Sequence, residues 1–512
     1  LPLPVLPATL AGDLPPLARD LNLFGRASLF HLLGTAHTPP GKAVLADWLL
    51  APAAPEEIAE RQAAVAELAP AIDLRQELEV RARPLERVRP DLEPFFRWAE
   101  DRPWLTGWMI GLARVLTPWP FPALLLWLGG ILPFWPFLLL AGINLGLTRQ
   151  LGRRIAETYD RISAREDDFQ LYAGALTAVA ERSFASPRLR RLVASLTAEG
   201  ISAARALDLL HRRVVLSDVR HAALLHTPLQ LLFLWDFHVL ALLERWQRDF
   251  GARARGWLRS LGELEALAAL GDLAHDEPEW TFPGVAPQET MSPALIEARR
   301  LGHPLLAGTA RVANDVTLGP PGTFLLVTGS NMSGKSTLLR AIGVNAVLAQ
   351  AGGPVCATSL QLPPLALATS ILIEDSLVDG VSFFMAELLR IRQVVDAADR
   401  TRAEKGEGRV CLYLLDEILR GTNTRERQIA VRRVLTHLLA QGALGAVSTH
   451  DLELALIPEL AAACQPVHFR ESFAPGAERE GKPVMTFDYR LRPGVATTAN
   501  ALKLLDLVGL GE

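Results

Sequence analysis

The residues best suited to chemistry in this 512-residue chain form a glycine-rich loop. The apolar run "TFLLV" leads into "GSNMSGKST", residues 329 to 337, which fits the spacing G-x-x-x-x-G-K-[ST]. The glycines let backbone N–H groups turn inward around phosphates, and the helix that follows adds partial positive charge at its N-terminus. The loop therefore predicts a site for ATP.

Two positions of the loop have separate expected tasks. Lys335 is expected at the β- and γ-phosphates of ATP, and Ser336 is expected to bind Mg²⁺. An incidental lysine in a glycine-rich turn is the alternative, but the whole chain has only five lysines, which favours the nucleotide site. The residues expected to contact the nucleotide are Gly329, Ser330, Asn331, Met332, Ser333, Gly334, Lys335, Ser336 and Thr337.

Acidic and imidazole side chains follow two later apolar runs. "RVCLYLLDE" ends in Asp416 and Glu417, and "VSTHD" places His450 after another run. Asp416 is expected to hold Mg²⁺, and Glu417 to orient and polarise the attacking water. His450 is expected to reach the γ-phosphate or that water. The alternatives are an ordinary acidic pair at a strand end and a structural histidine.

These side chains need elements that bring them together. From about residue 300, apolar runs such as "TFLLVTG", "RVCLYLLDE" and "GALGAVSTHD" alternate with helical runs, which predicts a mostly parallel α/β sheet. Ligands of such sheets bind at the carboxyl edge of the strands. Upstream, residues 20 to 100 and 149 to 275 have helical spacing, and Pro55 suits a helix start. A Pro-rich linker is expected at 275 to 290.

Composition narrows the class of protein. Half of the residues are hydrophobic, 21% are charged and the net charge is −4, which argues against a basic surface coat for nucleic acid. Three cysteines without a CxxC pair support neither a disulfide framework nor a zinc site, so a reducing cytosol fits. The opening "LPLPVLPATLAGDLPP" has no secretory signal pattern, and the initial Leu suggests that the true start is missing.

One segment is unusual for a protein that is entirely water-soluble, because residues 117 to 148 contain no charged side chain. Helices over 103 to 120 and 122 to 147 would be about 27 and 39 Å long, against a hydrocarbon thickness of about 30 Å. Two crossings are predicted, with the prolines at 118, 120 and 122 at the turn. Arginines flank both ends of the apolar segment, which predicts that both ends lie on the cytoplasmic side of the membrane. The side chain of Arg114 would snorkel, with its guanidinium extended to the membrane surface. A buried hairpin in a dimer interface is the alternative.

Six blocks, in order, resemble the MutS-type ATPases of DNA mismatch repair. They are "GHPLL" (302 to 306), "VAND" (312 to 315), "TGSNMSGKST" (328 to 337), "VSFFMAELLRI" (381 to 391), "LLDEILRGTNTRE" (414 to 426) and "STHDLELA" (448 to 455). Residues 21 to 52 and 261 to 280 are similar to the start and the end of the helical core domain of that family.

The resemblance implies a head-to-tail homodimer with two composite ATP sites. Ser382 is then expected at the γ-phosphate of the partner, with Gly421, Thr422 and Asn423 along the same interface. Asn314 and Val312 are expected at the nucleotide. The family usually has an aromatic residue that packs on adenine just before Val312, whereas this chain has Arg311, whose guanidinium could stack on the base.

The resemblance and the composition together suggest four segments. They are an N-terminal part of the helical core (1–102), a transmembrane helical hairpin (103–148), a helical lever (149–280) and a MutS-like P-loop ATPase domain (285–512). The helical core begins near residue 20, which leaves no room for the mismatch-reading domain of the family, so direct mismatch reading is not expected. Residues 149 to 260 contain 18 arginines, no lysine and 12 acidic residues, so this arm could contact a DNA backbone or be a solvated face.

Three functions are compatible with these observations. The first is a mismatch-repair-class ATPase on DNA, tethered at the cytoplasmic face of the cell membrane. The second is a membrane-anchored mechanical ATPase that acts on a protein or lipid partner. The third is an ATP-gated scaffold with slow turnover.

Overall fold

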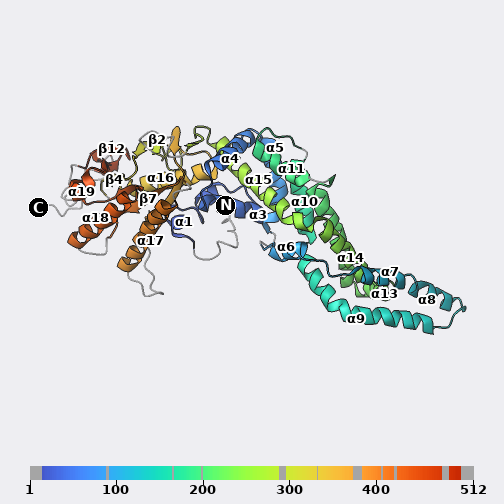
Figure 1. Ribbon diagram of the computed structural model, residues 1–512. Helices are drawn as coiled ribbons and strands as arrows, with labels where there is room; N and C mark the ends of the chain where they lie inside the picture. The colour runs from blue at the N-terminus through green and yellow to red at the C-terminus, as the bar shows by residue number, and fades with distance from the viewer. Residues whose placement is uncertain are drawn as a thin grey trace. The chain divides into compact units, whose positions relative to one another are not determined.

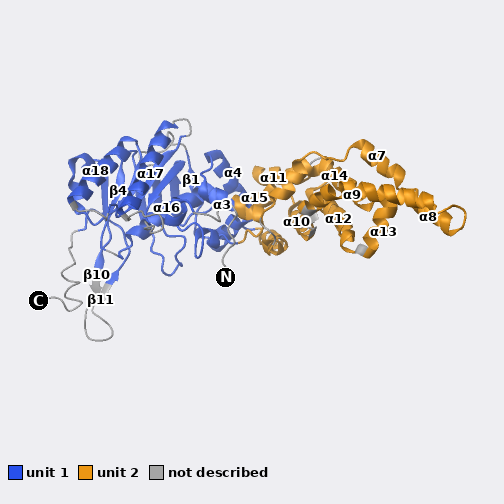
Figure 2. Ribbon diagram, turned by 90° about the horizontal axis from the view of Figure 1, so that it is seen from below, with its two compact units in different colours: residues 1–34, 45–70, 267–512 blue, residues 35–44, 71–266 orange. Residues whose placement is uncertain are grey.

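The computed structural model divides the chain into two compact units, which Figure 2 colours separately. It describes residues 14–87, 91–163, 166–180, 182–197, 200–286, 296–330, 332–372, 383–404, 408–419, 424–474 and 484–496. Unit 1 comprises residues 1–34, 45–70 and 267–512, and unit 2 comprises residues 35–44 and 71–266.

A six-stranded sheet forms the centre of unit 1. Its order is β12-β9-β4-β8-β7-β6, and every neighbouring pair is parallel except the edge pair of β12 and β9. The three runs predicted as buried strands are β4, β7 and β8, in which every residue is buried, so this prediction is confirmed. The strands are β4 (Phe324–Thr328), β6 (Leu365–Ser370), β7 (Val410–Asp416), β8 (Leu444–Ser448), β9 (Cys464–His468) and β12 (Arg492–Pro493).

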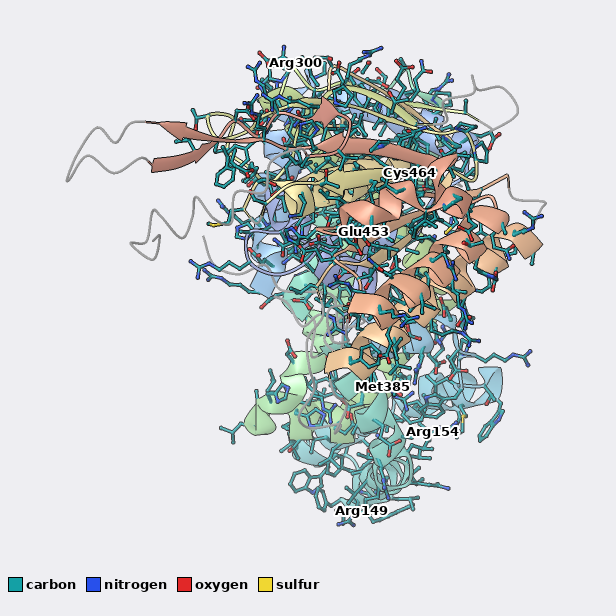
Figure 3. The ribbon with its side chains drawn as sticks, turned by 90° about the vertical axis from the view of Figure 1, so that its left-hand side faces the viewer. Arg149, Arg154, Arg300, Met385, Glu453 and Cys464 are labelled. Carbon is teal, nitrogen blue, oxygen red and sulfur yellow. The ribbon has the colours of Figure 1, made fainter. Side chains whose placement is uncertain are left out.

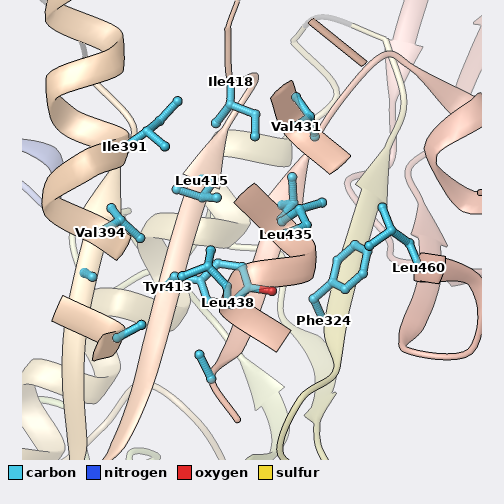
Figure 4. Close-up of a cluster of buried hydrophobic side chains, with 14 of the residues drawn as sticks. Phe324, Ile391, Val394, Tyr413, Leu415, Ile418, Val431, Leu435, Leu438 and Leu460 are labelled. Atoms are coloured by element: carbon cyan, nitrogen blue, oxygen red, sulfur yellow. The ribbon is translucent and has the colours of Figure 1, made fainter. Parts of the chain in front are cut away.

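Helices pack on this sheet through apolar side chains. α17 (Phe383–Ala403) and α18 (Thr424–Ala440) contribute Val394 and Leu435 to a cluster that also contains Phe324 of β4 and Tyr413 of β7 (Figure 4). Each large side chain buried in this way stabilises the fold by roughly 1.5–3 kcal/mol. The cluster therefore holds in place the strands at whose carboxyl ends the candidate site residues lie.

Gly445 of β8 offers a test of this packing. A Cβ added at Gly445 would lie 2.0 Å from the ring of Tyr413, which is fully buried and cannot move aside. We expect Gly445→Ala to lower the free energy of unfolding by about 3 kcal/mol, as overpacked cores do. Urea denaturation followed by circular dichroism measures this loss. Gly256→Ala is the control, because a Cβ there meets nothing within 4 Å, and equal stability of the two variants would contradict the prediction.

Shorter elements complete unit 1. A second sheet has the order β1-β5-β2-β3, and β10 and β11 form a separate antiparallel pair. The elements are α1 (Pro16–Asp20), α2 (Leu29–Leu32), α4 (Pro55–Leu68), β1 (Gly284–Val285), β2 (Ile296–Leu301), β3 (Asn314–Leu318), α16 (Lys335–Ala351), β5 (Ser359–Leu362), η7 (Leu452–Leu456), α19 (Pro458–Ala461), β10 (Glu471–Ala474) and β11 (Val484–Phe487). The predicted helix start at Pro55 is confirmed.

Unit 2 is helical in the part of it that the structure describes. Its core includes the stacked rings of Trp98 and Trp246, with Phe95 beside both. Its elements are α5 (Ile72–Ala82), η2 (Arg83–Arg87), α6 (Glu93–Glu100), α7 (Gly107–Leu116), α8 (Pro120–Leu128), α9 (Trp135–Ser163), α10 (Glu166–Ala180), α11 (Pro187–Thr197), α12 (Ala203–Val215), η4 (Leu216–His221), α13 (Ala223–Phe233), α14 (Trp235–Trp246) and η5 (Gln247–Gly251), while α3 (Pro39–Leu50) and α15 (Ala252–Asp276) belong to both units.

The apolar segment folds differently from the predicted pair of helices. α7 and α8 run in succession, and α9 returns beside α8 (Figure 1). The reversal lies between Leu128 and Trp135, not at the prolines 118, 120 and 122, so the predicted turn position is wrong. Pro120 and Pro122 instead occupy the first turn of α8, where a missing N–H breaks no helical hydrogen bond. Pro136 likewise lies in the first turn of α9.

Only one stretch among the described helices is long and apolar enough by itself to cross a membrane. It is Gly107–Leu128, which contains α7 and α8. Leu224–Phe233 passes the same test together with Trp235–Asp276, but the two are bent by 81°. The described part of residues 122 to 147 contains no second helix that is long and apolar enough to cross a membrane by itself. The two predicted crossings therefore stay a prediction.

Candidate functional site

The glycine-rich loop connects β4 with α16. Gly329 has φ 140° and Gly334 has φ 106°, a backbone region that side chains disfavour, and Gly334 is the N-cap of α16. A Cβ at Gly329 would lie 2.8 Å from Oγ of Ser333. The loop therefore needs both glycines to turn tightly from the strand into the helix, as the sequence predicts.

Lys335 lies at the centre of the loop. Its side chain is 4% exposed, and Nζ donates hydrogen bonds to the carbonyl oxygens of Gly329 (2.9 Å) and Ser330 (3.0 Å). Nζ also lies 3.6 Å from Oε1 of Glu417 and 3.4 Å from Nε2 of His450. The ammonium group is thus held over the mouth of the loop, where a phosphate would compete for it.

The sheet register brings the predicted acidic residues to the same edge. Ser448 of β8 pairs with both Val327 of β4 and Asp416 of β7, so the three strands end in one row. Glu417 follows Asp416, and its N–H donates to the carbonyl oxygen of Ser448 at 3.1 Å. Since Glu417 has φ 47°, its backbone leaves the strand direction at this point. The predicted meeting of loop and acidic pair is found.

Glu417 and His450 form a close pair at this edge. Nε2 of His450 lies 2.7 Å from Oε1 of Glu417, and the two side chains are 44% and 14% exposed. The Oγ of Ser448 donates a short hydrogen bond to Oδ1 of Asp416. The carboxylate of Asp416 is therefore anchored in the sheet, while the carboxylate of Glu417 contacts the accessible imidazole of His450.

A cavity of about 550 Å³ opens beside the loop. Its lining includes Ser336, Thr337 and Glu417 together with the apolar side chains of Val312 and Met332. A volume in the range of 300 to 1,000 Å³ is typical of small-molecule sites. Six of the nine predicted loop residues thus line one cavity with Glu417, namely Ser330, Met332, Gly334, Lys335, Ser336 and Thr337.

The cavity also contains residues that sequence analysis missed. Tyr489 and His303 line it, and the ring of Tyr489 approaches Gly334. Asn314 positions this segment, because its side chain donates to the carbonyl oxygen of Tyr489 (3.0 Å) and accepts from the N–H of Leu491 (2.7 Å). Asn314 does line the cavity as predicted. No sequence motif identifies Tyr489, because it is far from the glycine-rich loop in sequence and lies beside the loop only in the folded chain.

Arg311 does not offer its guanidinium to the cavity. It lies 5.2 Å from the ring centre of Trp280 and donates to the carbonyl oxygen of Leu306. It also pairs with Glu277. The possible stacking of Arg311 on a base is therefore not supported, and the aromatic residues that line the cavity are Phe469 and Tyr489.

The loop residues fit a triphosphate. Oγ of Ser333 is buried and finds no hydrogen-bond partner among the described residues, and Lys335 bonds to backbone carbonyls. Both are donors that phosphate oxygens would satisfy. No cluster of three His, Cys, Asp or Glu side chains occurs in the described residues, but Mg²⁺ at phosphates needs only one or two protein oxygens and water. Ser336 and Asp416 fit that role.

Several expected residues lie outside the described residues. They are Asn331 of the loop, Ser382 and the interface segment Gly421, Thr422 and Asn423. α17 begins immediately after Ser382, and the carboxylate of Glu387 on this helix accepts a hydrogen bond from the N–H of Leu419. Glu387 is fully buried, so α17 is fixed to the segment that follows Glu417. Sequence analysis missed this connection.

His303 makes the stability of the chain depend on pH. Burial, with added repulsion from Arg340 and Arg311, lowers the pKa of His303 from 6.5 to about 4. Because the unfolded chain binds the proton more tightly, stability present above pH 6.5 is lost as the pH falls towards 4. We expect a loss of about 2 kcal/mol between pH 8 and pH 5. Urea unfolding of wild type and His303→Gln measures it, and equal pH dependence in both would contradict the prediction.

Family models match two parts of this chain. MutS domain III matches residues 18–232, and MutS domain V matches residues 325–512. The second match contains the glycine-rich loop, Glu417 and His450.

Named relatives align over about half of the chain. "DNA mismatch repair protein MutS" of an Exiguobacterium species is 34% identical over 260 residues, which cover 50% of this chain and 28% of that protein. "Endonuclease MutS2" of Thermomicrobium roseum is 32% identical over 316 residues, covering 55% and 37%. "DNA mismatch repair protein MSH6" of Arabidopsis thaliana is 31% identical over 280 residues, covering 52% and 20%. The alignments thus cover less than two fifths of each relative.

Proposed function

This chain belongs to the MutS-related proteins, as its domains III and V show, and we propose that it hydrolyses ATP in a site completed by a second copy of itself. Domain V is the P-loop ATPase domain of that family. The observation that carries the proposal is the convergence of Lys335, Glu417 and His450 at the mouth of the glycine-rich loop.

These three residues have complementary tasks in the proposed hydrolysis. The Glu417 carboxylate accepts a proton from the water that attacks the γ-phosphorus, and the bond to the β–γ bridging oxygen breaks to leave ADP and phosphate. Lys335 stabilises the negative charge on the phosphate oxygens. His450, 2.7 Å from Glu417, orients that carboxylate. Tyr489 supplies an aromatic face for the base.

We assign Mg²⁺ to Ser336 and Asp416. A bound Mg²⁺ would neutralise charge on the β- and γ-phosphates. The chain itself keeps Asp416 in place through the hydroxyl of Ser448. ATP turnover is therefore expected to stop in excess EDTA and to return when Mg²⁺ is added, whereas turnover that persists in EDTA would exclude this assignment.

The second copy is proposed to pack at the start of α17. Met385 and Leu389 are 49% and 52% exposed and lie one helical turn apart, which gives the first two turns of α17 an apolar face (Figure 3 labels Met385). Ser382 is proposed to contact the γ-phosphate that the partner holds. Light scattering of the Glu417→Gln variant with ATP and Mg²⁺ tests this.

The expected mass with ATP is that of a dimer, and Met385→Glu is expected to keep the chain monomeric without loss of ATP binding. Ile429→Glu on α18 is the matched control, since Ile429 is similarly exposed. A monomer that hydrolyses ATP at a rate independent of protein concentration would overturn the composite site.

DNA is the proposed partner, because two of the relatives are named as DNA mismatch repair proteins. The arginines of residues 149 to 260 would contact the phosphate backbone, although several already pair with carboxylates, such as Arg188 with Glu263 and Arg212 with Asp208. Filter binding over a range of salt concentrations is the test. Affinity that falls steeply with salt supports DNA. DNA binding that is absent at low salt favours the alternative, a mechanical ATPase or ATP-gated scaffold acting on a protein or lipid partner.

Attachment to the cytoplasmic face of the cell membrane is also proposed. Of 34 large apolar side chains that are exposed in the described residues, 16 lie between Trp108 and Leu145, a concentration far above that of ordinary soluble surfaces. Flotation with lipid vesicles tests the attachment. We expect the full chain to float and the double variant Leu138→Glu, Leu139→Glu to float less, and a wild-type chain that stays with the soluble fraction would contradict it.

A further inference from the structure

We propose that α13 is a further lipid-contacting helix, which lies beside the apolar arm in a lipid bilayer. The apolar arm is α7, α8 and residues 135–148 of α9. No Asp, Glu, Lys or Arg occurs from His221 to Trp235, a range that contains all of α13. This inference rests on the membrane attachment proposed above and adds a contact that the charge-free segment 117 to 148 does not include.

α13 and α9 have an inverted distribution of polarity. Gln230 and Asn144 are only 5% and 1% exposed, whereas Leu224 and Leu225 are 96% and 54% exposed. A soluble helix bundle buries its leucines and exposes its amides, because water hydrates the amides. The opposite arrangement is favoured where hydrocarbon surrounds the bundle.

The buried amides hold α13 against the arm. Nδ2 of Asn144 donates to the carbonyl oxygen of Leu231 at 2.7 Å, and Nε2 of Gln230 donates to Oγ1 of Thr148 at 2.9 Å. The ring of Phe233 lies 5.9 Å from the ring of Phe121 on α8. α13 is therefore a fixed part of the same bundle as α8 and α9.

The arginines around the arm indicate how deeply it enters a bilayer. Arg114 lies fourteen residues before Leu128, and Arg149 lies fourteen residues after Trp135. Both arginines are therefore about 21 Å along the helices from the reversal, more than half of a hydrocarbon core of about 30 Å. Thr148, which bonds to α13, is next to Arg149, so α13 joins the arm close to the level of the headgroups (Figure 3 labels Arg149 on α9).

The shape of α13 excludes a further crossing. Its 11 residues span about 16 Å, about half of the hydrocarbon thickness. The chain then bends by 81° at Leu234, which has φ 46°. α13 is thus expected to lie in the interface with Leu224 and Leu225 among the acyl chains, as amphipathic interfacial helices do.

Lipid fits this surface better than a second copy of the arm. Four consecutive residues of α8, from Leu125 to Leu128, are all at least 36% exposed. Successive helical residues are about 100° apart, so these four face nearly every direction around the helix. A partner helix would cover one side only, whereas acyl chains surround a helix completely.

Fluorescent labels on the full chain provide the test. Cys356 and Cys411 are buried, so Cys464→Ser gives a background with little accessible thiol. Leu224→Cys, Leu139→Cys and Val80→Cys are labelled with an environment-sensitive fluorophore. Vesicles of equal parts phosphatidylcholine and phosphatidylglycerol, with and without a spin-labelled lipid, are then added. Val80 on α5 is the control, because it is 71% exposed and lies outside the arm.

Labels at 139 and 224 are both expected to shift to shorter wavelength and to be quenched by the spin-labelled lipid, while the label at 80 is unchanged. Quenching at 139 without quenching at 224 would overturn the role of α13 and leave the membrane attachment standing. Absence of quenching at both positions would overturn the attachment itself. A shift at 224 that follows protein concentration without vesicles would assign the surface to a second copy.

A charge placed on the surface gives a second measurement. Leu224→Glu with Leu225→Glu alters two exposed positions, so the fold is expected to be retained. Vesicle affinity is expected to fall at least about tenfold, since two leucines leave the acyl region. Val80→Glu should bind vesicles like the wild type, and an unchanged affinity of the double variant would contradict the inference.

Discussion

Glu417→Gln is expected to lower the rate of ATP hydrolysis by a factor of roughly 10²–10⁴ without preventing ATP binding. The amide keeps the size of the side chain but cannot accept a proton from water. It also replaces the charged partner that lies 2.7 Å from His450 and 3.6 Å from Lys335. Phosphate release under single-turnover conditions measures the chemical step separately from product release.

The matched control for this variant is Glu459→Gln, which changes the same charge at an exposed position of α19. It is expected to hydrolyse ATP like the wild type. If Glu417→Gln hydrolyses ATP at the wild-type rate, Glu417 does not activate the water. If it loses ATP binding as well, the defect lies in the folding of the loop and not in the chemistry.

The sheet strands and the glycine-rich loop were predictable because each is encoded by a short, continuous stretch of residues. A strand buried on both faces appears as a continuous apolar run, and β4, β7 and β8 end at or within two residues of Gly329, Asp416 and His450. Parallel strands place their carboxyl ends at one edge, so the meeting of Lys335, Glu417 and His450 follows from the order of the runs alone. The glycine positions likewise follow from the backbone that the loop needs.

Other parts of the site depend on contacts between distant segments, which no local pattern encodes. Tyr489 reaches the cavity because Asn314, 175 residues earlier, bonds to its backbone. Arg311 is drawn away by Trp280 and Glu277, neither of which the sequence places beside it. The aromatic rings that line the cavity come instead from Phe469 and Tyr489, which follow β9 and β11 in the chain.

The apolar segment shows the same limit. The three prolines predict a turn, but proline also suits the first turn of a helix, and Pro120 and Pro122 lie in the first turn of α8. The reversal falls instead at Gly129 and Gly130, where Gly130 has φ 71°. α13 has no more than 11 residues, so no search for membrane-length runs would select it by itself.

Replacement of Lys335 by Met is expected to weaken ATP binding at least about a hundredfold, which corresponds to about 3 kcal/mol of charge-assisted hydrogen bonding to phosphate. Methionine fills similar space, but it offers no donor to the triphosphate and no counter-charge to Glu417. The loss of affinity should be smaller for adenosine than for ATP, because the base and ribose do not contact the ammonium group of Lys335. Titration with a fluorescent ATP analogue measures the affinity.

Arg392→Met removes an equal charge from an exposed position of α17 and serves as the control. Unfolding midpoints of both variants show whether the loop region still folds, since Lys335 also bonds to Gly329 and Ser330 in the absence of phosphate. A Lys335→Met variant that folds normally and binds ATP within about threefold of the wild type, a difference below 1 kcal/mol, would show that the ammonium group does not contact the phosphates. The proposed hydrolysis would then lose its charge-stabilising group, because Lys335 is the only lysine at this edge among the residues that the structure describes.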